Sequence, residues 1–231
     1  MTSSPIAAMF DRISPKYDAL NHLLSLNIDK VWRRKTAKVV AKNHPKAILD
    51  LATGTADLAI ALAKRNPQAK IIGMDISEKM LDIGKGKVKR QNLENQIELN
   101  FGDAASLPFE DDSFDAVTVA FGVRNFEDLS KGLSEISRVL KPNGQTVILE
   151  FSLPERFPVK QLYNLYFKHI LPKIGGIVSK DKNAYAYLPA SVEKFPKPES
   201  FRNLLASNGL KNGKAKQLSW GIATLYVASK A

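Results

Sequence analysis

The stretch that most constrains the fold runs from Ala47 to Asp57 and predicts a strand, a tight turn and a helix. An apolar run at residues 48–51 is followed by small residues at 53–56, and an apolar-periodic segment begins directly afterwards. Such a unit places free backbone N–H groups and a helix N-terminus at the carboxyl end of a strand, where open α/β sheets bind ligands. The sequence therefore predicts an α/β fold with a ligand site at this turn.

The residues of the turn restrict which ligand it can hold. It contains one glycine, Gly54, and no lysine, so it matches neither the G-x-G-x-x-G turn of dinucleotide folds nor a P-loop. Asp50 and Asp57 flank it, which is the wrong sign for a polyphosphate and the right sign for a cation. S-adenosylmethionine, with its sulfonium and ammonium groups, is such a ligand. Asp75 follows about twenty residues on, the usual place for the carboxylate that accepts ribose hydroxyls.

Strand and helix patterns continue to alternate beyond this unit. Further strands are expected at residues 71–75, 97–101, 114–121 and 146–151, with helices between them. Asp103 follows the third strand and is a candidate acceptor for an adenine amine. Two last strands, 210–218 and 222–228, added in antiparallel fashion, complete a seven-stranded, Rossmann-like sheet with helices on both faces.

We expect a single domain with four parts. Residues 1–46 form an N-terminal arm and a basic helix, 47–151 the ligand-binding core, 152–197 a helical insertion after the fifth strand, and 198–231 a final helix and two strands. Ser14-Pro15 is expected to break any helix in the arm, because proline disfavours helix at the residue before it. Tyr17 in this arm can close over the site.

The insertion carries an apolar stripe at helical spacing. Val159, Leu162, Tyr163, Tyr166, Phe167 and Ile170 recur at the spacing of one helix face. Such a stripe either packs as core or forms a lid over a large apolar substrate, with the glycines at 175 and 176 as a hinge.

Composition excludes several classes of protein. The chain has 231 residues, no cysteine and three histidines, so disulfides, thiolate metal sites and a cysteine nucleophile are excluded, and we expect no metal. No long apolar run or secretory signal pattern is present, so we expect a cytoplasmic protein.

The net charge of +11 is concentrated in the two ends of the chain. Residues 1–46 hold nine Lys and Arg against three Asp and Glu, residues 47–157 hold thirteen against seventeen, and residues 158–231 hold twelve against three. Basic flanks can face nucleic-acid phosphates or an anionic membrane surface, or can simply be solvated.

Several motifs resemble the UbiE/MenG family of quinone C-methyltransferases. They are Phe10-Asp11-x-x-Ser14-x-x-Tyr17-Asp18-x-x-Asn21, the turn from Asp50 to Asp57, Phe121-Gly122-Val123-Arg124-Asn125, Arg138-Val139-Leu140-Lys141-Pro142-x-Gly144, Glu150-Phe151-Ser152 and Leu171-Pro172-x-x-Gly175. The resemblance covers nearly the whole chain and implies a class I methyltransferase fold. It also implies carbon methylation of a prenylated benzo- or naphthoquinol.

The resemblance implies cofactor contacts at Thr55, Asp75, Asp103 and Ala104. We add Gly54 and Tyr17 to the expected cofactor site, and Tyr163, Phe167 and His169 to the expected substrate site. The Thr-Ala-Asp ending of the turn is more similar to the menaquinone branch, which favours demethylmenaquinol over a ubiquinone precursor. The expected partners are the prenylated quinol and an anionic membrane at its inner face, with a possible homodimer and no nucleic acid.

The chemistry requires a nucleophilic ring carbon beside an ionised hydroxyl. A phenol has a pKa near 10, so a fixed cation beside the forming phenolate raises the reactive fraction. Arg124, directly after the fourth strand, is the candidate cation, and a salt bridge to a loop acid is its alternative role. Asn125 holds the water that takes the proton, or His169 accepts it.

Three other functions compete. A nucleic-acid methyltransferase fits the charge but needs an Asn/Asp-Pro-Pro-Tyr type loop for exocyclic amines, which this chain lacks. A dehydrogenase is disfavoured by the single glycine of the turn. A non-enzymatic lipid- or RNA-binding module would have lost the site residues.

Overall fold

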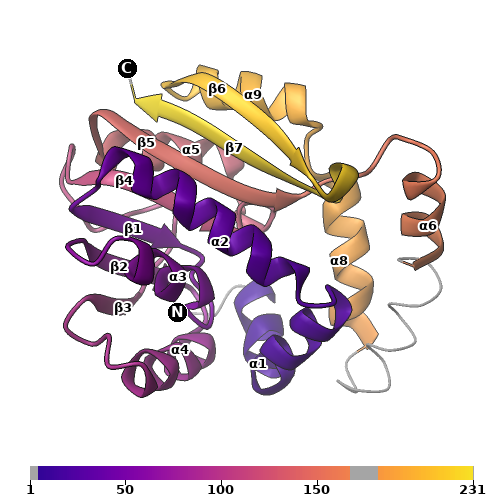
Figure 1. Ribbon diagram of the computed structural model, residues 1–231, viewed down its shortest axis with the longest axis horizontal. Coiled ribbons are helices and arrows are strands. Elements are labelled where there is room, and N and C mark those ends of the chain that lie inside the picture. The colour runs from indigo at the N-terminus through magenta and orange to yellow at the C-terminus, as the bar shows by residue number, and fades with distance from the viewer. Residues whose placement is uncertain (1–4, 167–181, 231) are drawn as a thin grey trace.

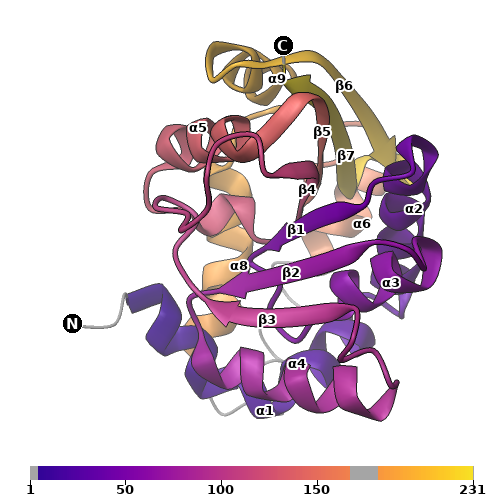
Figure 2. The same ribbon diagram turned by 90° about the vertical axis from the view of Figure 1, so that its left-hand side faces the viewer.

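The computed structural model describes residues 5–166 and 182–230, and its strands form one seven-stranded sheet in the order β3-β2-β1-β4-β5-β7-β6 (Figures 1 and 2). The strands are β1 Ala47–Leu51, β2 Lys70–Asp75, β3 Ile97–Phe101, β4 Phe114–Ala120, β5 Leu140–Phe151, β6 Leu210–Leu218 and β7 Ala223–Lys230. The predicted sheet and its Rossmann-like connections are confirmed. Only β7 runs against its neighbours, since β6 pairs antiparallel with β7 and so points the same way as the first five.

Helices cover both faces of the sheet. They are α1 Pro5–Leu24, α2 Ile28–Val40, α3 Asp57–Arg65, α4 Glu78–Arg90, α5 Leu129–Val139, α6 Val159–Leu165, α8 Lys182–Lys194 and α9 Pro198–Ser207, with short 3-10 turns that include η2 Val123–Asn125 and η4 Ser219–Gly221. The apolar faces of α2, α3 and α4 pack on one side, around Ile48 and Ile71. Those of α5 and α9 pack on the other, around Leu49 and Val119. Side chains of successive residues in the buried strands therefore point to opposite faces of the sheet and belong to two separate hydrophobic cores.

The arm contains a continuous helix where the sequence predicted a break. α1 runs through Pro15, which cannot donate a hydrogen bond to the carbonyl of Asp11. The hydroxyl of Ser14 donates to that carbonyl at 3.0 Å instead. The helix thus keeps this acceptor satisfied across its proline, and the expectation of a broken arm was wrong.

The fifth strand also begins earlier than predicted. The fifth strand was expected at residues 146–151, yet β5 starts at Leu140 and includes Lys141-Pro142-Asn143-Gly144. Leu140 pairs with Phe114 and Gln145 with Ala116, so the four residues between them form an irregularity in the ladder. Asn143 accommodates it with a φ of 62°.

Strand order reverses between β1 and β4, both of which are parallel to their neighbours on either side. In open α/β sheets this switch point opens a crevice at the carboxyl ends of the strands. The turn after β1 lies there, and so do α1 and the middle of α8, which meets the site through Tyr187 and Leu188. Within residues 5–166 and 182–230, no helix is both long and apolar enough to cross a bilayer.

Candidate active site

A cavity of about 600 Å³ opens at the switch point. The turns that follow β1, β2, β3 and β4 form its floor, and α1 forms its roof. Its walls comprise Ile6, Ala7, Phe10, Asp11, Tyr17, Leu51, Ala52, Gly54, Met74, Asp75, Ile76, Glu78, Met80, Phe101, Gly102, Asp103, Ala104, Ala120, Phe121, Gly122, Asn125, Phe126 and Glu127. We name it the acidic cavity, because five of these residues are acids and no described lining residue is a lysine, arginine or histidine.

The turn after β1 is built to present one carboxylate to this cavity. Gly54 adopts a φ of +55°, a conformation that costs glycine little, and its N–H donates to Oδ2 of Asp75 at 2.8 Å. The N–H of Ser77 donates to Oδ1 at 2.9 Å. Burial raises the pKa of Asp75 to about 6, against the lowering effect of these backbone donors. The carboxylate is thus fixed in place and keeps lone pairs for a ligand hydroxyl.

Most of the expected cofactor residues line the acidic cavity. Gly54, Asp75, Asp103, Ala104 and Tyr17 are all on its walls, although their role in binding stays a prediction. The side chain of Asp103 caps its own turn, accepting from the N–H of Ala105 at 2.9 Å.

Thr55 is the exception among them. It does not line the cavity, because its buried hydroxyl donates to Asp18 and accepts from Nζ of Lys87 at 3.1 Å. The structure thus turns this side chain toward α1 and α4, away from the expected ligand.

The acids that flank the turn also differ from the prediction. Asp50 is 1% exposed and accepts from the hydroxyls of Thr53 and Thr118. It therefore stabilises the turn from within the protein core. Burial raises the pKa of Asp50 to about 6. Asp57 pairs with Lys87. Neither lines the acidic cavity, so the expectation that these two acids face the cation was wrong.

A second cavity, of about 370 Å³, adjoins the first. We name it the apolar cavity, because its walls are mostly aromatic and aliphatic side chains from α1, α2, α6, α8 and the ends of β4 and β5. They are Tyr17, Asn21, Ser25, Leu26, Ile28, Asp29, Trp32, Arg33, Phe121, Phe151, Val159, Leu162, Tyr163, Tyr166, Leu188, Trp220 and Ile222. Tyr17 and Phe121 line both cavities, so the two spaces meet at these rings.

Phe121 is held at this junction by an unusual backbone. It has a φ of 60°, which is uncommon for a bulky residue and marks strain of a kind that gathers at functional sites. Its ring stacks on Phe151 with centroids 4.4 Å apart and lies 6.0 Å from the ring of Trp32. The result is a flat aromatic wall suited to a planar ring system.

Two of the expected substrate residues lie outside the described part of the chain. Tyr163 lines the apolar cavity, as expected of a substrate contact. Phe167 and His169 fall within residues 167–181, so the structure does not place them.

Arg124 has the alternative role that the sequence left open. Its Nη1 donates to Oε1 of Glu150 at 2.7 Å and to the carbonyl of Phe121, and its Nε donates to Ser191 at 3.2 Å. The Arg124 side chain is 6% exposed and that of Glu150 is 0% exposed, and Arg124 lines neither cavity. The expectation that Arg124 is the cation beside the substrate hydroxyl is therefore corrected, because its guanidinium is held by Glu150 away from both cavities.

Asn125, by contrast, reaches the acidic cavity. Its Oδ1 accepts from the hydroxyl of Tyr187 at 2.8 Å, which fixes the orientation of the amide. The amide N–H groups therefore point away from Tyr187, as donors that a ligand oxygen can use.

The cation that lines the apolar cavity is Arg33, which the sequence analysis missed. It is 9% exposed, its guanidinium carbon lies 5.2 Å from the centroid of the Phe121 ring, and it pairs with Asp29 one helical turn earlier. Arg33 lies in a helix with four further basic side chains, Lys30, Arg34, Lys35 and Lys38, so composition alone did not single it out. Its place one residue after Trp32, on the border of the apolar face, was the available signal.

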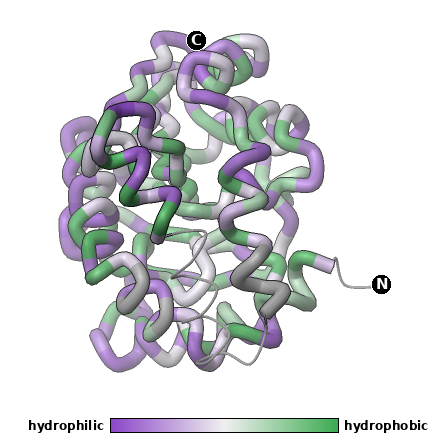
Figure 3. Tube along the Cα trace, turned by 90° about the vertical axis from the view of Figure 1, so that its right-hand side faces the viewer, coloured by the Kyte–Doolittle hydropathy of each residue, from purple (hydrophilic) through white to green (hydrophobic). Residues whose placement is uncertain are grey.

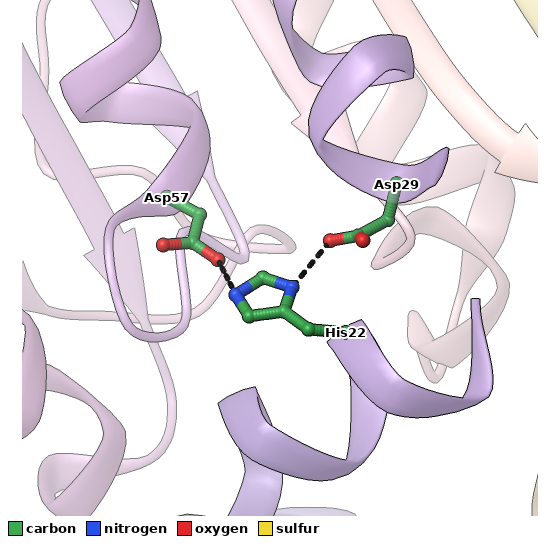
Figure 4. Close-up of side chains that lie close together, drawn as sticks. All are labelled: His22, Asp29 and Asp57. Atoms are coloured by element: carbon green, nitrogen blue, oxygen red, sulfur yellow. Dashed lines mark hydrogen bonds and ion pairs between the residues drawn. The ribbon is translucent and has the colours of Figure 1, made fainter. Parts of the chain in front are cut away.

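Polar contacts hold α1 over both cavities. Asp11 accepts from the hydroxyl of Ser77 at 2.6 Å, and Asp18 accepts from Nζ of Lys87 at 2.9 Å. His22 lies between Asp29, at 2.9 Å from its Nδ1, and Asp57, at 3.6 Å from its Nε2 (Figure 4).

His22, Asp29 and Asp57 have the grouping of a metal site, but their charges are matched from within the protein. Arg33 pairs with Asp29 and Lys87 with Asp57. Burial alone would raise the pKa of Asp29, and the hydrogen bond from Ser25 with the charge of Arg33 outweighs it and lowers that pKa. We therefore assign these residues to the contacts of α1 and not to a metal.

The sheet order and the crevice at its switch point are those of the Rossmann-like fold of class I methyltransferases. A methyltransferase from Aquifex aeolicus described as SAM-dependent superposes with a TM-score of 0.62 at 19% identity, covering 85% of this chain and 89% of that one. Human N-acetylserotonin methyltransferase, solved in complex with SAM, has a TM-score of 0.61 at 20% identity, covering 94% of this chain and 58% of that one.

Sequence comparison identifies the family. The chain belongs to the ubiE/COQ5 methyltransferase family, whose sequence profile matches residues 1–230. The demethylmenaquinone methyltransferase of Bacteroides fragilis is 47% identical, and the match covers 99% of this chain and 93% of that protein. The ubiquinone/menaquinone biosynthesis C-methyltransferase UbiE of Geotalea daltonii is 46% identical, and the match covers 97% of this chain and 96% of that protein.

Proposed function

We propose that this protein transfers a methyl group from S-adenosylmethionine to a ring carbon of a prenylated quinol, demethylmenaquinol in menaquinone biosynthesis. The observation that carries this proposal is the meeting of an acidic and an apolar cavity at Tyr17 and Phe121. A cationic donor fits the first and a planar apolar acceptor fits the second. The names of the relatives support the reaction, and those of the UbiE type make a benzoquinol of ubiquinone biosynthesis the alternative substrate.

The described residues fit the methyl donor. Asp75 offers a fixed carboxylate for ribose hydroxyls, Asp103 an acceptor for the adenine amine, and the surplus of acids favours a sulfonium and an ammonium. Gly102 is required by packing against another wall residue, since a Cβ there would lie 1.9 Å from Cε of Met74. When bound, S-adenosylmethionine supplies an electrophilic methyl group.

The acceptor becomes reactive when its hydroxyl loses a proton. We propose that Arg33 stabilises the resulting phenolate, because it lines the apolar cavity beside Phe121 and its guanidinium has N–H donors besides the Nη1 that pairs with Asp29. Asn125 donates to an oxygen at the junction, and the hydroxyl proton passes to water. Arg124 keeps a positioning role, holding the η2 turn through Glu150 so that Asn125 reaches the cavity.

Replacing Arg33 by methionine tests this assignment. We expect kcat to fall by about 100- to 1,000-fold, the usual effect of removing one preorganised electrostatic group. The kcat of the variant should rise further with pH than that of the parent, because the substrate hydroxyl must then ionise unaided. Arg65→Met, at the exposed end of α3, is the control and should leave kcat within a few-fold. Equal pH profiles for Arg33→Met and the parent would assign Arg33 a structural role.

A direct assay tests the reaction itself. Purified protein, S-adenosylmethionine and a short-chain demethylnaphthoquinol kept reduced should give the C-methylated quinol, identified by mass spectrometry, and a benzoquinol should be methylated more slowly. Faster methylation of the benzoquinol would select the alternative substrate. Methylation of neither, with S-adenosylmethionine bound, would contradict the proposal.

The prenylated tail of such a substrate resides in a membrane, so we also propose that the enzyme works at an anionic membrane surface, in keeping with its basic ends. The homodimer stays a prediction, which sedimentation velocity tests.

A further inference from the structure

Large apolar side chains are exposed in an uneven pattern. Nine of them are exposed among the described residues, and all but Phe101 come from three short segments at 26–31, 153–165 and 220. They are Leu26, Ile28, Val31, Leu153, Phe157, Leu162, Leu165 and Trp220, with Leu26, Phe157 and Trp220 about four-fifths exposed at 77%, 81% and 78%. Scattered apolar residues on a surface are ordinary, but a concentration of this kind marks a binding face.

The three segments surround the mouth of the apolar cavity. Leu26, Ile28, Leu162 and Trp220 line that cavity and are also exposed, so they form its rim. The corner between α1 and α2, the helix α6 and the turn η4 all lie on the right-hand side of Figure 1. Figure 3 faces this side, where apolar and polar segments of the chain intermingle.

In two turns of this rim, the exposed apolar residue has a left-handed backbone conformation. Leu26 and Asn27 have φ of 50° and 60°, and Ser219 and Trp220 have φ of 45° and 56°. This left-handed backbone is unfavourable for residues with a Cβ, above all for Leu26 and Trp220. Nε1 of buried Trp32 donates to Oγ of Ser219 at 3.0 Å, which anchors the second turn. The fold therefore sustains a cost that leaves a leucine and a tryptophan in water.

The rim is surrounded by positive charge. Within residues 26–35, 153–165 and 216–222, the exposed charged side chains are Lys30, Arg34, Lys35, Arg156, Lys160 and Lys216 against a single exposed acid, Glu155. Apolar tips within a basic surround match an anionic bilayer, in which the apolar groups enter the interface and the cations meet lipid phosphates.

We infer that this rim docks on the surface of an anionic lipid bilayer, with Leu26 and Trp220 inserted, so that the apolar cavity opens directly into the membrane. The inference rests on the proposed function for its purpose. A cavity of about 370 Å³ is at the lower end of the range for one small ligand, so a long prenyl tail has to leave through the mouth. With the mouth against the bilayer, the tail stays in lipid while the ring enters the protein.

Trp220 provides a built-in probe, since the only other tryptophan, Trp32, is 3% exposed. Vesicles of phosphatidylcholine and phosphatidylglycerol, with and without brominated acyl chains, are titrated with the full chain in the absence of quinol. We expect brominated lipid to quench the fluorescence, and high salt or pure phosphatidylcholine vesicles to abolish binding.

Substitutions separate the contribution of the basic side chains to vesicle binding from that of the apolar side chains. Lys30→Glu with Arg34→Glu should weaken vesicle binding more than tenfold, because each basic residue near an anionic surface adds to the attraction and each glutamate is repelled. Lys64→Glu with Arg65→Glu, a matched pair at the exposed end of α3, should change it less than threefold. Leu26→Ser with Trp220→Ser should also weaken binding, as measured by vesicle sedimentation.

The outcomes separate this inference from the proposed function. Vesicle binding without quenching, or equal effects of the two charge pairs, would overturn the docking surface even if methyl transfer to a short-chain quinol is normal. Loss of self-association in Leu26→Ser with Trp220→Ser, seen by sedimentation velocity without vesicles, would assign the rim to a second copy and also overturn it. Methyl transfer to the short-chain quinol by the Lys30→Glu, Arg34→Glu variant should match that of the parent.

Discussion

Glu150→Ala is expected to destabilise the protein by about 3–5 kcal/mol, because it removes one partner of a buried ion pair and leaves the other without compensation. Arg124 would remain 6% exposed with its charge unmatched. The same carboxylate also accepts from the backbone N–H groups of Phe151 at 2.8 Å and Arg124 at 3.3 Å, so the η2 turn loses its anchor. Urea unfolding followed by circular dichroism measures the change.

A double-mutant cycle identifies the cause of this loss. Arg124→Met with Glu150→Ala removes both charges, so the double variant should be more stable than Glu150→Ala alone. Glu94→Ala, an exposed acid between α4 and β3, is the control and should cost less than about 0.5 kcal/mol. Additive effects of the two single changes would mean that the pair has no coupling, and that Arg124 finds water or another partner when Glu150 is absent.

The sequence predicted those parts of the fold that local patterns determine. Alternation of apolar runs with helical periods located all seven strands, and the helix α4 begins after Ser77, whose side chain accepts from the N–H of Met80. Spacing predicted that Asp75 lies beside the turn after the first strand, because the end of the second strand is next to that turn in this topology; its role in binding stays a prediction.

Partnerships made across the fold could not be predicted in the same way. Glu150 lies in a strand that reads as apolar, and nothing in the sequence indicates that it meets Arg124. Arg33 and Lys87 belong to helices rich in other basic residues, and only packing selects the one that enters a cavity or pairs with Asp57. Pro15 is a case in which the local rule gave the wrong prediction. A proline usually ends a helix, but α1 continues because the hydroxyl of Ser14 donates to the carbonyl of Asp11 that Pro15 cannot bond.

Asp75→Asn is expected to weaken binding of S-adenosylmethionine by about 100-fold. Hydrogen bonds to a charged group contribute about 1.5–3 kcal/mol each, and loss of about 3 kcal/mol corresponds to two powers of ten in Kd. The amide cannot replace the carboxylate, because the N–H groups of Gly54 and Ser77 both donate to it and one would then face the amide NH₂. Isothermal titration calorimetry measures the Kd. Asp57→Asn, a change in the same turn but outside the cavity, should alter the Kd only a few-fold.

The pH dependence of binding provides a second, independent test of Asp75. Burial raises the pKa of this carboxyl to about 6 in the ligand-free protein, so it is ionised above that pH and protonated below it. Only the ionised form offers both oxygens as acceptors, and the affinity should therefore fall as pH decreases below about 6, approaching tenfold for each pH unit. Asp75→Asn should remove this dependence while Asp57→Asn keeps it. An unchanged pH profile in Asp75→Asn would place the titrating group elsewhere, with Asp50, whose pKa burial also raises to about 6, as the next to replace.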